Sequence, residues 1–518
     1  MLAMAPAAGL VLASLAVVLA TSLWTAAVHL VWRPYAVARA FRRQGIRGPA
    51  YRFFVGNNRP TPRGVEAYNP KTLCLSNNEE AMAMRAATAD DVLDLGSHDI
   101  IGRVMPHYKV WVASYGKMFL SWSGYTPAIC VRDLDMVKQI LSNRTGLYVK
   151  TNPGPNLLAL LGNGLVFSEG DDWARRRRIV HPAFTMDKLK MMTRTMAECA
   201  GEMVRPWEER GAASGGGVAL VDDVGQQFVE LTADVISHTA FGSSYREGKE
   251  VFVAQRELQY IAVSTINNVR VPGLEYLPTK TTLRRRQLTG KVRGTLMAII
   301  RERQAAAKEA KGYGNDLLGL MLEANTSAGA GGQKVAAMSM DDIIDECKTF
   351  FFAGHDTTAH LLTWAIFLLG THPEWQQKLR EEVLRECGGT GTPLHGDALN
   401  KLKLTTMIPK GTITMIPTAM MHRDEEVWGA DAGEFKPDRF RNGVGRAAKH
   451  PSAILAFAIG PRSCIGQDFA MLEAKATLVV ILRRFEFEIA PEYVHAPVEF
   501  LTLQPKCGLP VLLKLLDQ

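Results

Sequence analysis

The residues Phe457–Gly466, near the C-terminal end of the chain, carry one cysteine in a frame of glycine, proline and arginine. They read Phe-Ala-Ile-Gly-Pro-Arg-Ser-Cys-Ile-Gly. A cysteine thiolate donates electron density strongly to haem iron, and this donation favours cleavage of an O–O bond. An isolated cysteine is usually a small buried hydrophobic residue, so Cys464 alone would predict little. Within its frame, Cys464 is predicted to be an axial ligand of haem iron.

The other residues of this loop fit the same site. Gly460 and Gly466 lack side chains, so the backbone beside them can approach a flat ring closely. Phe457 can pack against that ring, and Arg462 can form a charge-assisted pair with one of its propionates. We therefore predict that these four residues bind the cofactor, haem b, and that Cys464 binds its metal.

A second group of polar residues lies inside an apolar stretch, at Ala353-Gly354-His355-Asp356-Thr357-Thr358. A glycine within a helix costs roughly 1 kcal/mol relative to alanine, so Gly354 needs a reason, and one reason is room for dioxygen beside a cofactor. Thr357 can bond back to the preceding turn and open the helix locally. With Asp356 it could deliver protons during oxygen activation, which is general acid catalysis. The alternative is a kinked core helix with incidental polar residues.

The elements that must position these residues are mostly helices. Apolar residues recur at helical spacing among charges over 185–210 and 288–310, and 340–370 is apolar throughout, as expected of a buried central helix. Short β-prone runs occur near 115–129 and 498–513, and glycine-rich loops are predicted at 211–217, 327–332 and 388–393. The fold class is therefore predicted to be mainly α with minor β, without internal repeats.

The N-terminus is predicted to anchor the chain in a membrane. Residues 1–32 contain no Asp, Glu, Lys or Arg, and a membrane-spanning helix needs about 20 apolar residues. Arginines follow directly, which places the C-terminal side in the cytosol. A cleaved signal peptide is the alternative, but its positive charge would precede the apolar run. Residues 33–60 are predicted to be a basic and proline hinge, broken at Gly45 and Gly48-Pro49, before a catalytic domain over 61–518.

Charge and cysteine spacing narrow the possible partners. A net charge of +8 suits an anionic membrane surface or an acidic protein, and no basic stripe with interleaved aromatic residues indicates nucleic acid. The seven cysteines are dispersed and form no Cys-x-x-Cys pair, so their spacing indicates neither a disulfide framework nor a zinc site.

The cysteine loop and the Ala353–Thr358 helix together resemble the haem-thiolate monooxygenases of the cytochrome P450 superfamily. Further features are similar to plant clan 72. They are Trp32-Arg33-Pro34, the run Glu346–His355 and His495-Ala496-Pro497. Residues Arg446–Pro451 and Leu501–Pro505 look most like family 709.

This resemblance implies several further roles. Trp173 and Arg177, four residues apart on one helix face, are similar to a family pair that binds a haem propionate. The run Arg175–Arg178 would otherwise be a solvated basic face, part of which could dock an acidic reductase. The implied activity is insertion of one atom of O2 into a lipophilic small molecule, such as a fatty acid or a plant hormone or terpenoid-like compound. The implied electron source is NADPH, through NADPH–cytochrome P450 reductase. The implied location is the endoplasmic reticulum membrane, with a single span and a cytosolic catalytic domain.

The chain departs from the family pattern near residues 407–408. Residues 401–407 resemble the lead-in to a Glu-x-x-Arg helix, but Ile408 begins a strand and turn that normally follow some tens of residues later. The sequence therefore predicts a missing segment, and Arg439 is expected to face the core without its usual carboxylate partner. The Glu-x-x-Arg pattern at Glu382–Arg385 is expected to be a surface pair instead. An inactive or truncated P450-like membrane protein is accordingly the alternative function.

Overall fold

The structure is a computed structural model. It describes residues 5–53, 92–96, 98–143, 146–214, 217–242, 245–265, 277–310, 312–314, 316–326, 338–386 and 412–516. The junction at 407–408 and the predicted loops at 327–332 and 388–393 lie outside these residues.

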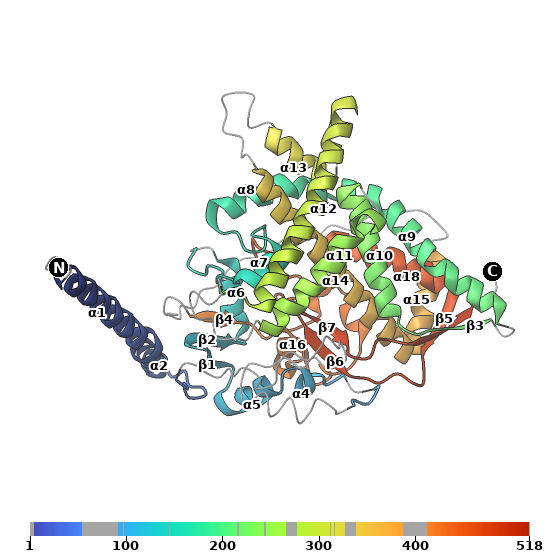
Figure 1. Ribbon diagram of the computed structural model, residues 1–518. Coiled ribbons are helices and arrows are strands. Elements are labelled where there is room, and N and C mark those ends of the chain that lie inside the picture. Colours follow the sequence, from blue (N-terminus) through green and yellow to red (C-terminus); the bar gives the residue numbers. More distant parts are fainter. Residues whose placement is uncertain are drawn as a thin grey trace.

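Helices make up most of the described chain (Figure 1). In order they are α1 (Ala5–Ala27), η1 (Val28–Trp32), α2 (Arg33–Arg43), α4 (Ile101–Val104), α5 (Pro106–Tyr115), α6 (Leu134–Ser142), α7 (Pro155–Leu161), α8 (Gly170–Val180), η3 (His181–Phe184), α9 (Met186–Ala213), α10 (Val224–Phe241), α11 (Tyr245–Thr265), α12 (Lys280–Ala310), α13 (Leu317–Thr326), α14 (Met340–Thr371), α15 (Pro373–Glu386), α16 (Thr418–Met421), α17 (Glu425–Trp428), η6 (Pro437–Phe440), η7 (Val444–Arg446) and α18 (Gln467–Arg484).

Eight short strands form three small sheets among the described residues. Strand β2 pairs antiparallel with β1 and parallel with β4, β8 pairs antiparallel with both β3 and β5, and β6 with β7 form a two-stranded hairpin. The strands are β1 (Met118–Ser123), β2 (Thr126–Val131), β3 (Val218–Val221), β4 (Ile413–Met415), β5 (Phe485–Ile489), β6 (Pro497–Phe500), β7 (Thr502–Pro505) and β8 (Val511–Leu515). The predicted class, mainly α with minor β, is confirmed.

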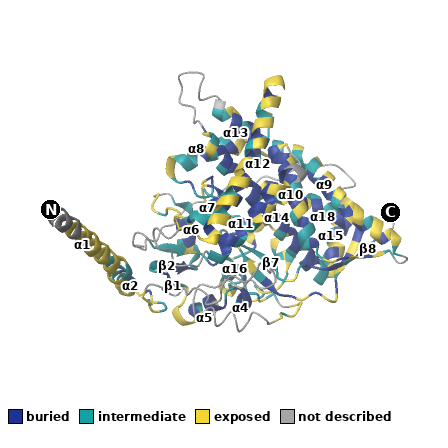
Figure 2. Ribbon diagram, viewed as in Figure 1, coloured by how far each residue is buried: buried dark blue, intermediate teal, exposed yellow. Residues whose placement is uncertain are grey.

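Helix α14 is the centre of the core. Figure 2 shows it among buried segments of α10, α11 and α18. It begins with a capping box, in which Ser339 Oγ accepts from the Asp342 N–H at 3.1 Å and Asp342 Oδ2 accepts from the Ser339 N–H at 3.0 Å. Such a cap satisfies backbone donors at the helix start. Its residues Phe351 and Leu362 are fully buried, as the continuous apolar pattern predicted.

Helix α1 extends away from this body (Figure 1). One helical stretch among the described residues, Ala13–Arg43, is long and apolar enough to cross a membrane, and its most apolar part is entirely unburied. The helix continues past residue 32, since a π-helical turn leads directly into α2. It ends at Arg43, just before Gly45 with its φ of +79°. Phe41 of α2 is fully buried, so α2 is already part of the folded body.

The residues after α2 also pack tightly. The Leu120 N–H of β1 donates to the Arg47 carbonyl at 2.9 Å. A Cβ added to Gly48 would lie 1.8 Å from the Leu120 carbonyl oxygen. Only glycine fits this close approach, so residues 47–48 run directly along β1. The rest of the predicted hinge, from residue 54, lies outside the described residues.

Candidate haem site

The cysteine loop is a tight turn that leads into α18. The Cys464 N–H donates to the Phe457 carbonyl at 2.9 Å, and the Ser463 N–H donates to the Gly460 carbonyl at 3.0 Å. Gly466 is the residue that precedes the first turn of α18. The Cys464 side chain is exposed. The loop therefore presents a single thiol, on a backbone held by its own hydrogen bonds, at the N-terminal end of a helix.

The Gly466 backbone N–H and the Arg177 guanidinium both act on this thiol. The pKa of the Cys464 thiol lies above its ordinary value, because burial raises it by more than the Gly466 backbone N–H and the Arg177 guanidinium lower it. The N-terminal end of α18 adds the positive end of a helix dipole, which favours negative charge. These groups are suited to a sulfur that becomes a thiolate when it binds a metal.

Gly460 is required by the turn itself. Its φ is +83°, and a Cβ at this position would lie 2.5 Å from the Leu141 carbonyl oxygen at the end of α6. A side chain is therefore excluded by both the backbone conformation and the close approach of α6. This packing accounts for Gly460 without a cofactor, so its role in cofactor binding remains a prediction.

Helix α8 brings Trp173 and Arg177 to the cysteine loop. The guanidinium of Arg462 lies over the Trp173 ring, with 4.8 Å between its central carbon and the ring centroid. Arg462 also donates to the Ser168 carbonyl at 2.6 Å and pairs with Glu169 Oε1 at 3.0 Å. Burial lowers the pKa of Arg177, and Cys464 opposes this shift. Four of the predicted site residues, including Cys464, are thus brought together, although sequence analysis did not foresee Glu169 as the partner of Arg462.

One arginine of the run Arg175–Arg178 corrects the prediction of a solvated basic face. The Arg176 side chain is only 4% exposed and lies 3.1 Å from a carboxylate oxygen of Glu346, which is 0% exposed. Arg176 also pairs with Asp172 and Asp342. The prediction was wrong here because the helix turns this position inward, against α14. The i,i+4 spacing of Asp172 and Arg176 was the available signal.

On α14, the two predicted catalytic residues point in different directions. Thr357 is exposed, although its neighbours Asp356 and Thr358 are buried, and its hydroxyl donates to the Ala353 carbonyl at 2.7 Å. The bond back to the preceding turn is the one expected from the sequence. Asp356 instead accepts a hydrogen bond of 2.9 Å from the Thr502 hydroxyl on β7. Sequence analysis had no signal for this contact between residues so far apart in the chain.

Gly354 serves helix packing. A Cβ added there would lie 2.8 Å from two side-chain carbons of Ile236 on α10. One residue further on, the His355 carbonyl accepts a 2.9 Å hydrogen bond from the Thr232 hydroxyl of the same helix. The glycine therefore allows α10 to approach α14 closely, and its predicted place beside the cofactor remains untested.

Aromatic residues connect the cysteine loop with α14. Phe184 of η3 stacks on Phe350 of α14, with ring centroids 5.6 Å apart, and lies 3.9 Å from the position of a Cβ on Gly466.

Further along α18, Glu473 is fully buried against α14. Burial raises the pKa of its carboxyl well above the usual range, while the nearby Thr358 lowers it. Neither carboxyl oxygen has a partner at hydrogen-bond geometry among the described residues.

The structure also corrects the expectation of an unpaired Arg439. Its guanidinium lies 2.8 Å from Asp431 Oδ1 and donates to the Trp428 carbonyl at 2.7 Å. A carboxylate eight residues upstream thus neutralises Arg439, and it was missed because sequence analysis considered only the family's own partner. Glu382 and Arg385 of α15 are both exposed, as expected of a surface pair.

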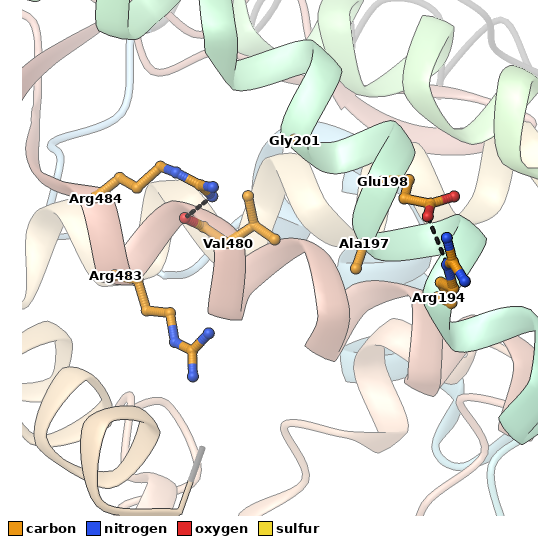
Figure 3. A pocket seen from close by; sticks show the side chains of 7 residues that line it. All are labelled: Arg194, Ala197, Glu198, Gly201, Val480, Arg483 and Arg484. Carbon is orange, nitrogen blue, oxygen red and sulfur yellow. Dashed lines mark hydrogen bonds and ion pairs between the residues drawn. The ribbon is translucent and has the colours of Figure 1, made fainter. Parts of the chain in front are cut away.

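A surface pocket of about 580 Å³ lies elsewhere, between α9 and α18 (Figure 3). Its lining includes three arginines, Arg194, Arg483 and Arg484, and the carboxylate of Glu198. Arg194 pairs with Glu198 at 2.7 Å, and Arg484 pairs with Glu208 at 2.7 Å. None of the predicted site residues lines this pocket, so it carries no part of the predicted chemistry.

The residues present fit a haem. An exposed thiol lies beside two half-buried arginines and a tryptophan, and the exposed Thr357 lies between two buried residues of α14. A thiolate ligand, cations for propionates and a hydroxyl near bound oxygen are the groups that such a cofactor requires.

Comparison with known proteins agrees with this fit. The family model described as Cytochrome P450 matches residues 93–408 and 405–508. The chain is 41% identical to Cytochrome P450 709B1 of Arabidopsis thaliana, over 98% of this chain and 99% of the relative. It is 40% identical to Cytochrome P450 709B3 of the same plant, over 95% and 96%. It is 36% identical to Secologanin synthase 1 of Catharanthus roseus, over 93% of each.

This chain belongs to the cytochrome P450 family. Membership implies a haem-dependent monooxygenase in which a cysteine thiolate is the axial ligand of the iron, with electrons supplied from NADPH through a reductase.

The comparisons also bear on the departure near residues 407–408. The family match is divided into two parts that meet at residues 405–408. The alignment with the 709B1 relative is 540 positions long and therefore exceeds the 518 residues of this chain, so it contains gaps in this chain. Both observations agree with a missing segment, whose place near residues 407–408 stays a prediction.

Proposed function

We propose that this chain is a membrane-anchored monooxygenase that hydroxylates a lipophilic small molecule, with Cys464 as the iron ligand. The observation that carries the proposal is the exposed Cys464 thiol at the start of α18, in a loop whose Arg462 lies over the Trp173 ring of α8. Haem, when bound, supplies the activation of dioxygen. The protein supplies the ligand, the cations and the proton donors.

Each predicted site residue has a role in this proposal. Trp173, Arg177 and Arg462 would hold the propionates of a bound haem, with Arg462 exchanging its present partner Glu169 for one of them. Phe457, Gly460 and Gly466 would shape the loop beside the cofactor. Together these residues would hold the haem next to the Cys464 thiol.

Proton delivery is assigned to α14. Thr357 is exposed and its hydroxyl is anchored to the Ala353 carbonyl, which orients the oxygen. Asp356 is the nearest carboxylate in sequence, and it would reach Thr357 by releasing Thr502. A hydroxyl backed by a carboxylate can pass a proton inward while excluding bulk water.

The substrate class rests on the relatives. Secologanin synthase is named for a small organic product, and the family 709 and 734 proteins share nearly the whole chain length. A fatty acid, or a plant hormone or terpenoid-like compound, is the class we propose. The N-terminal apolar helix supports a single-pass anchor, which we assign to the endoplasmic reticulum membrane with NADPH–cytochrome P450 reductase as partner.

The test is a reduced carbon-monoxide difference spectrum of the chain expressed in microsomes. The expected result is the red-shifted Soret band of thiolate-ligated haem in the wild type and in Cys507→Ser, which changes another exposed cysteine. The band should be lost in Cys464→Ser. A band that survives in Cys464→Ser would remove Cys464 from its assigned role.

The same measurement separates the alternative of an inactive chain, for which the comparisons give no support. A chain that lacks the band but regains it when the segment missing near residues 407–408 is restored would be an incomplete form of the enzyme. A band in the chain as it stands means that the fold tolerates the loss.

A further inference from the structure

We propose that Cys199, Asp234 and His238 form a site for a single zinc ion between α9 and α10. The cysteine sulfur, a carboxylate oxygen and an imidazole nitrogen all lie within 4.8 Å of one another, in the part of the chain that the structure describes. Thiolate, carboxylate and imidazole are the ligand types that zinc takes in proteins. The site is separate from the Cys464 loop and from the proposed oxygen chemistry.

The helices place the three ligands on facing surfaces. Asp234 and His238 are four residues apart on α10, so their side chains project from one face. Their nearest ligand atoms, Oδ1 and Nε2, are 3.4 Å apart. Cys199 comes from α9, which packs against α10. Zinc takes its ligands at about 2.0–2.3 Å, so small rotations of the two α10 side chains would bring all three to one ion.

The three ligands differ in their exposure to solvent. Cys199 is 8% exposed, whereas the Asp234 and His238 side chains are 35% and 41% exposed. The Cys199 sulfur therefore lies at the buried end of the site, and the other two ligands lie at the surface. An ion can enter from solvent, and a water molecule can complete its coordination.

The bound ion would brace α10 against α9. Helix α10 also carries Thr232 and Ile236, which contact His355 and the backbone at Gly354 on α14. A metal at the outer face of α10 would therefore stiffen the helix that supports the centre of α14.

No spacing pattern in the sequence indicates this site, because its ligands are dispersed. The cysteine has no partner at a zinc-finger spacing, and only the Asp234–His238 pair has a regular interval. The folded chain brings the third ligand from another helix.

The experiment measures zinc bound to the purified full-length chain. Wild type and variants are dialysed against buffered micromolar free zinc, and metal per chain is read by elemental mass spectrometry. The loss-of-ligand variants are His238→Ala and Asp234→Asn. His238 is exposed, so its removal should leave the fold intact. The matched controls are His181→Ala and Cys507→Ser, which remove an exposed histidine and an exposed cysteine elsewhere.

The expected result is a single zinc ion in the wild type and in both controls, with binding at least about tenfold weaker in His238→Ala and Asp234→Asn. Circular dichroism confirms that each variant is folded. The proposal is overturned if the folded wild type retains no zinc, or if the controls lose as much zinc as the ligand variants. Cys464 is unchanged in every variant, so failure of its haem role would not alter this comparison.

Discussion

The hydroxyl of Thr502 on β7 donates a 2.9 Å hydrogen bond to Oδ2 of Asp356 on α14. His360, one turn further along α14, places its Nδ1 3.8 Å from the same oxygen and 3.4 Å from the Thr502 hydroxyl. The carboxylate proposed for proton delivery is therefore held toward the β6–β7 hairpin, whereas Thr357 is exposed. In this arrangement the hairpin controls whether Asp356 is free to move.

Replacing Thr502 by valine should lower the stability of the fold and the fraction of consumed NADPH that leads to product rather than to peroxide. The buried carboxylate would lose a hydrogen bond to a charged group, which costs about 1.5–3 kcal/mol. We expect a lower urea midpoint and, in the reconstituted enzyme, more peroxide released per NADPH consumed. Thr502→Ser keeps the hydroxyl and should restore both values. Equal behaviour of the valine and serine variants would show that the hydroxyl does not position Asp356.

Removing Arg176 should destabilise the fold strongly. Glu346 is 0% exposed and would lose its guanidinium partner, and breaking one side of a buried pair costs about 3–5 kcal/mol. The measurement is denaturant unfolding of Arg176→Ala beside Arg178→Ala. Arg178 is exposed, so its removal should change stability by no more than about 0.5 kcal/mol. Similar losses in the two variants would contradict the buried pair.

His495 should make the folded state sensitive to mild acid. It is buried, stacks on Phe367 with ring centroids 4.6 Å apart, and lies 3.0 Å from the Tyr493 hydroxyl. Burial lowers the pKa of His495 from 6.5 to about 4. As the pH falls from 6.5, the unfolded chain therefore takes up a proton before the folded chain, and stability drops until the pH reaches about 4.

The check is urea unfolding across this pH range for wild type and His495→Phe. The variant keeps an aromatic ring for the stack but cannot titrate, so its stability should fall less on acidification. An identical pH dependence in the two proteins would assign the acid sensitivity to other groups.

Adding a methyl group at Gly460 should loosen the cysteine loop. The positive φ of Gly460 opposes a side chain, and an added Cβ would lie 2.5 Å from the Leu141 carbonyl oxygen. Such strain costs on the order of 1–3 kcal/mol. We expect Gly460→Ala to retain less haem per chain after gel filtration. Gly445→Ala is the control, because a Cβ there meets no atom within 4 Å. Normal haem content in Gly460→Ala would mean that the loop can relax.

The sequence was most informative where the pattern is local. The apolar run over 340–370 predicted α14, and the beta-prone segments near 115–129 and 498–513 predicted strands that the structure contains. Strands β3 and β5 were missed, since each is short and pairs with β8, which is not adjacent to either in the chain. Local periodicity does not report such distant pairing.

Within the candidate site, the loop frame predicted which residues gather around Cys464, but their partners could not be foreseen. Arg462 contacts Glu169, Asp356 contacts Thr502, and Arg439 contacts Asp431. These pairings depend on how helices and turns meet in three dimensions. Arg176 is a further example. Four consecutive arginines predict an exposed basic face, but the helix turns Arg176 inward, where it pairs with Glu346.

The unbroken passage from α1 through the π-helical turn into α2 has a mechanical consequence. Phe41, fully buried, fixes the end of α2 to the sheet of β1 and β2, and the apolar stretch before it is exposed. A bilayer that holds α1 would then also hold the catalytic body at a fixed height and tilt, because a continuous helix is rigid whereas a flexible linker is not. The cluster that buries Val37, Phe41 and Ile46 against β1 and β2 would thereby set the orientation of the catalytic body relative to that bilayer.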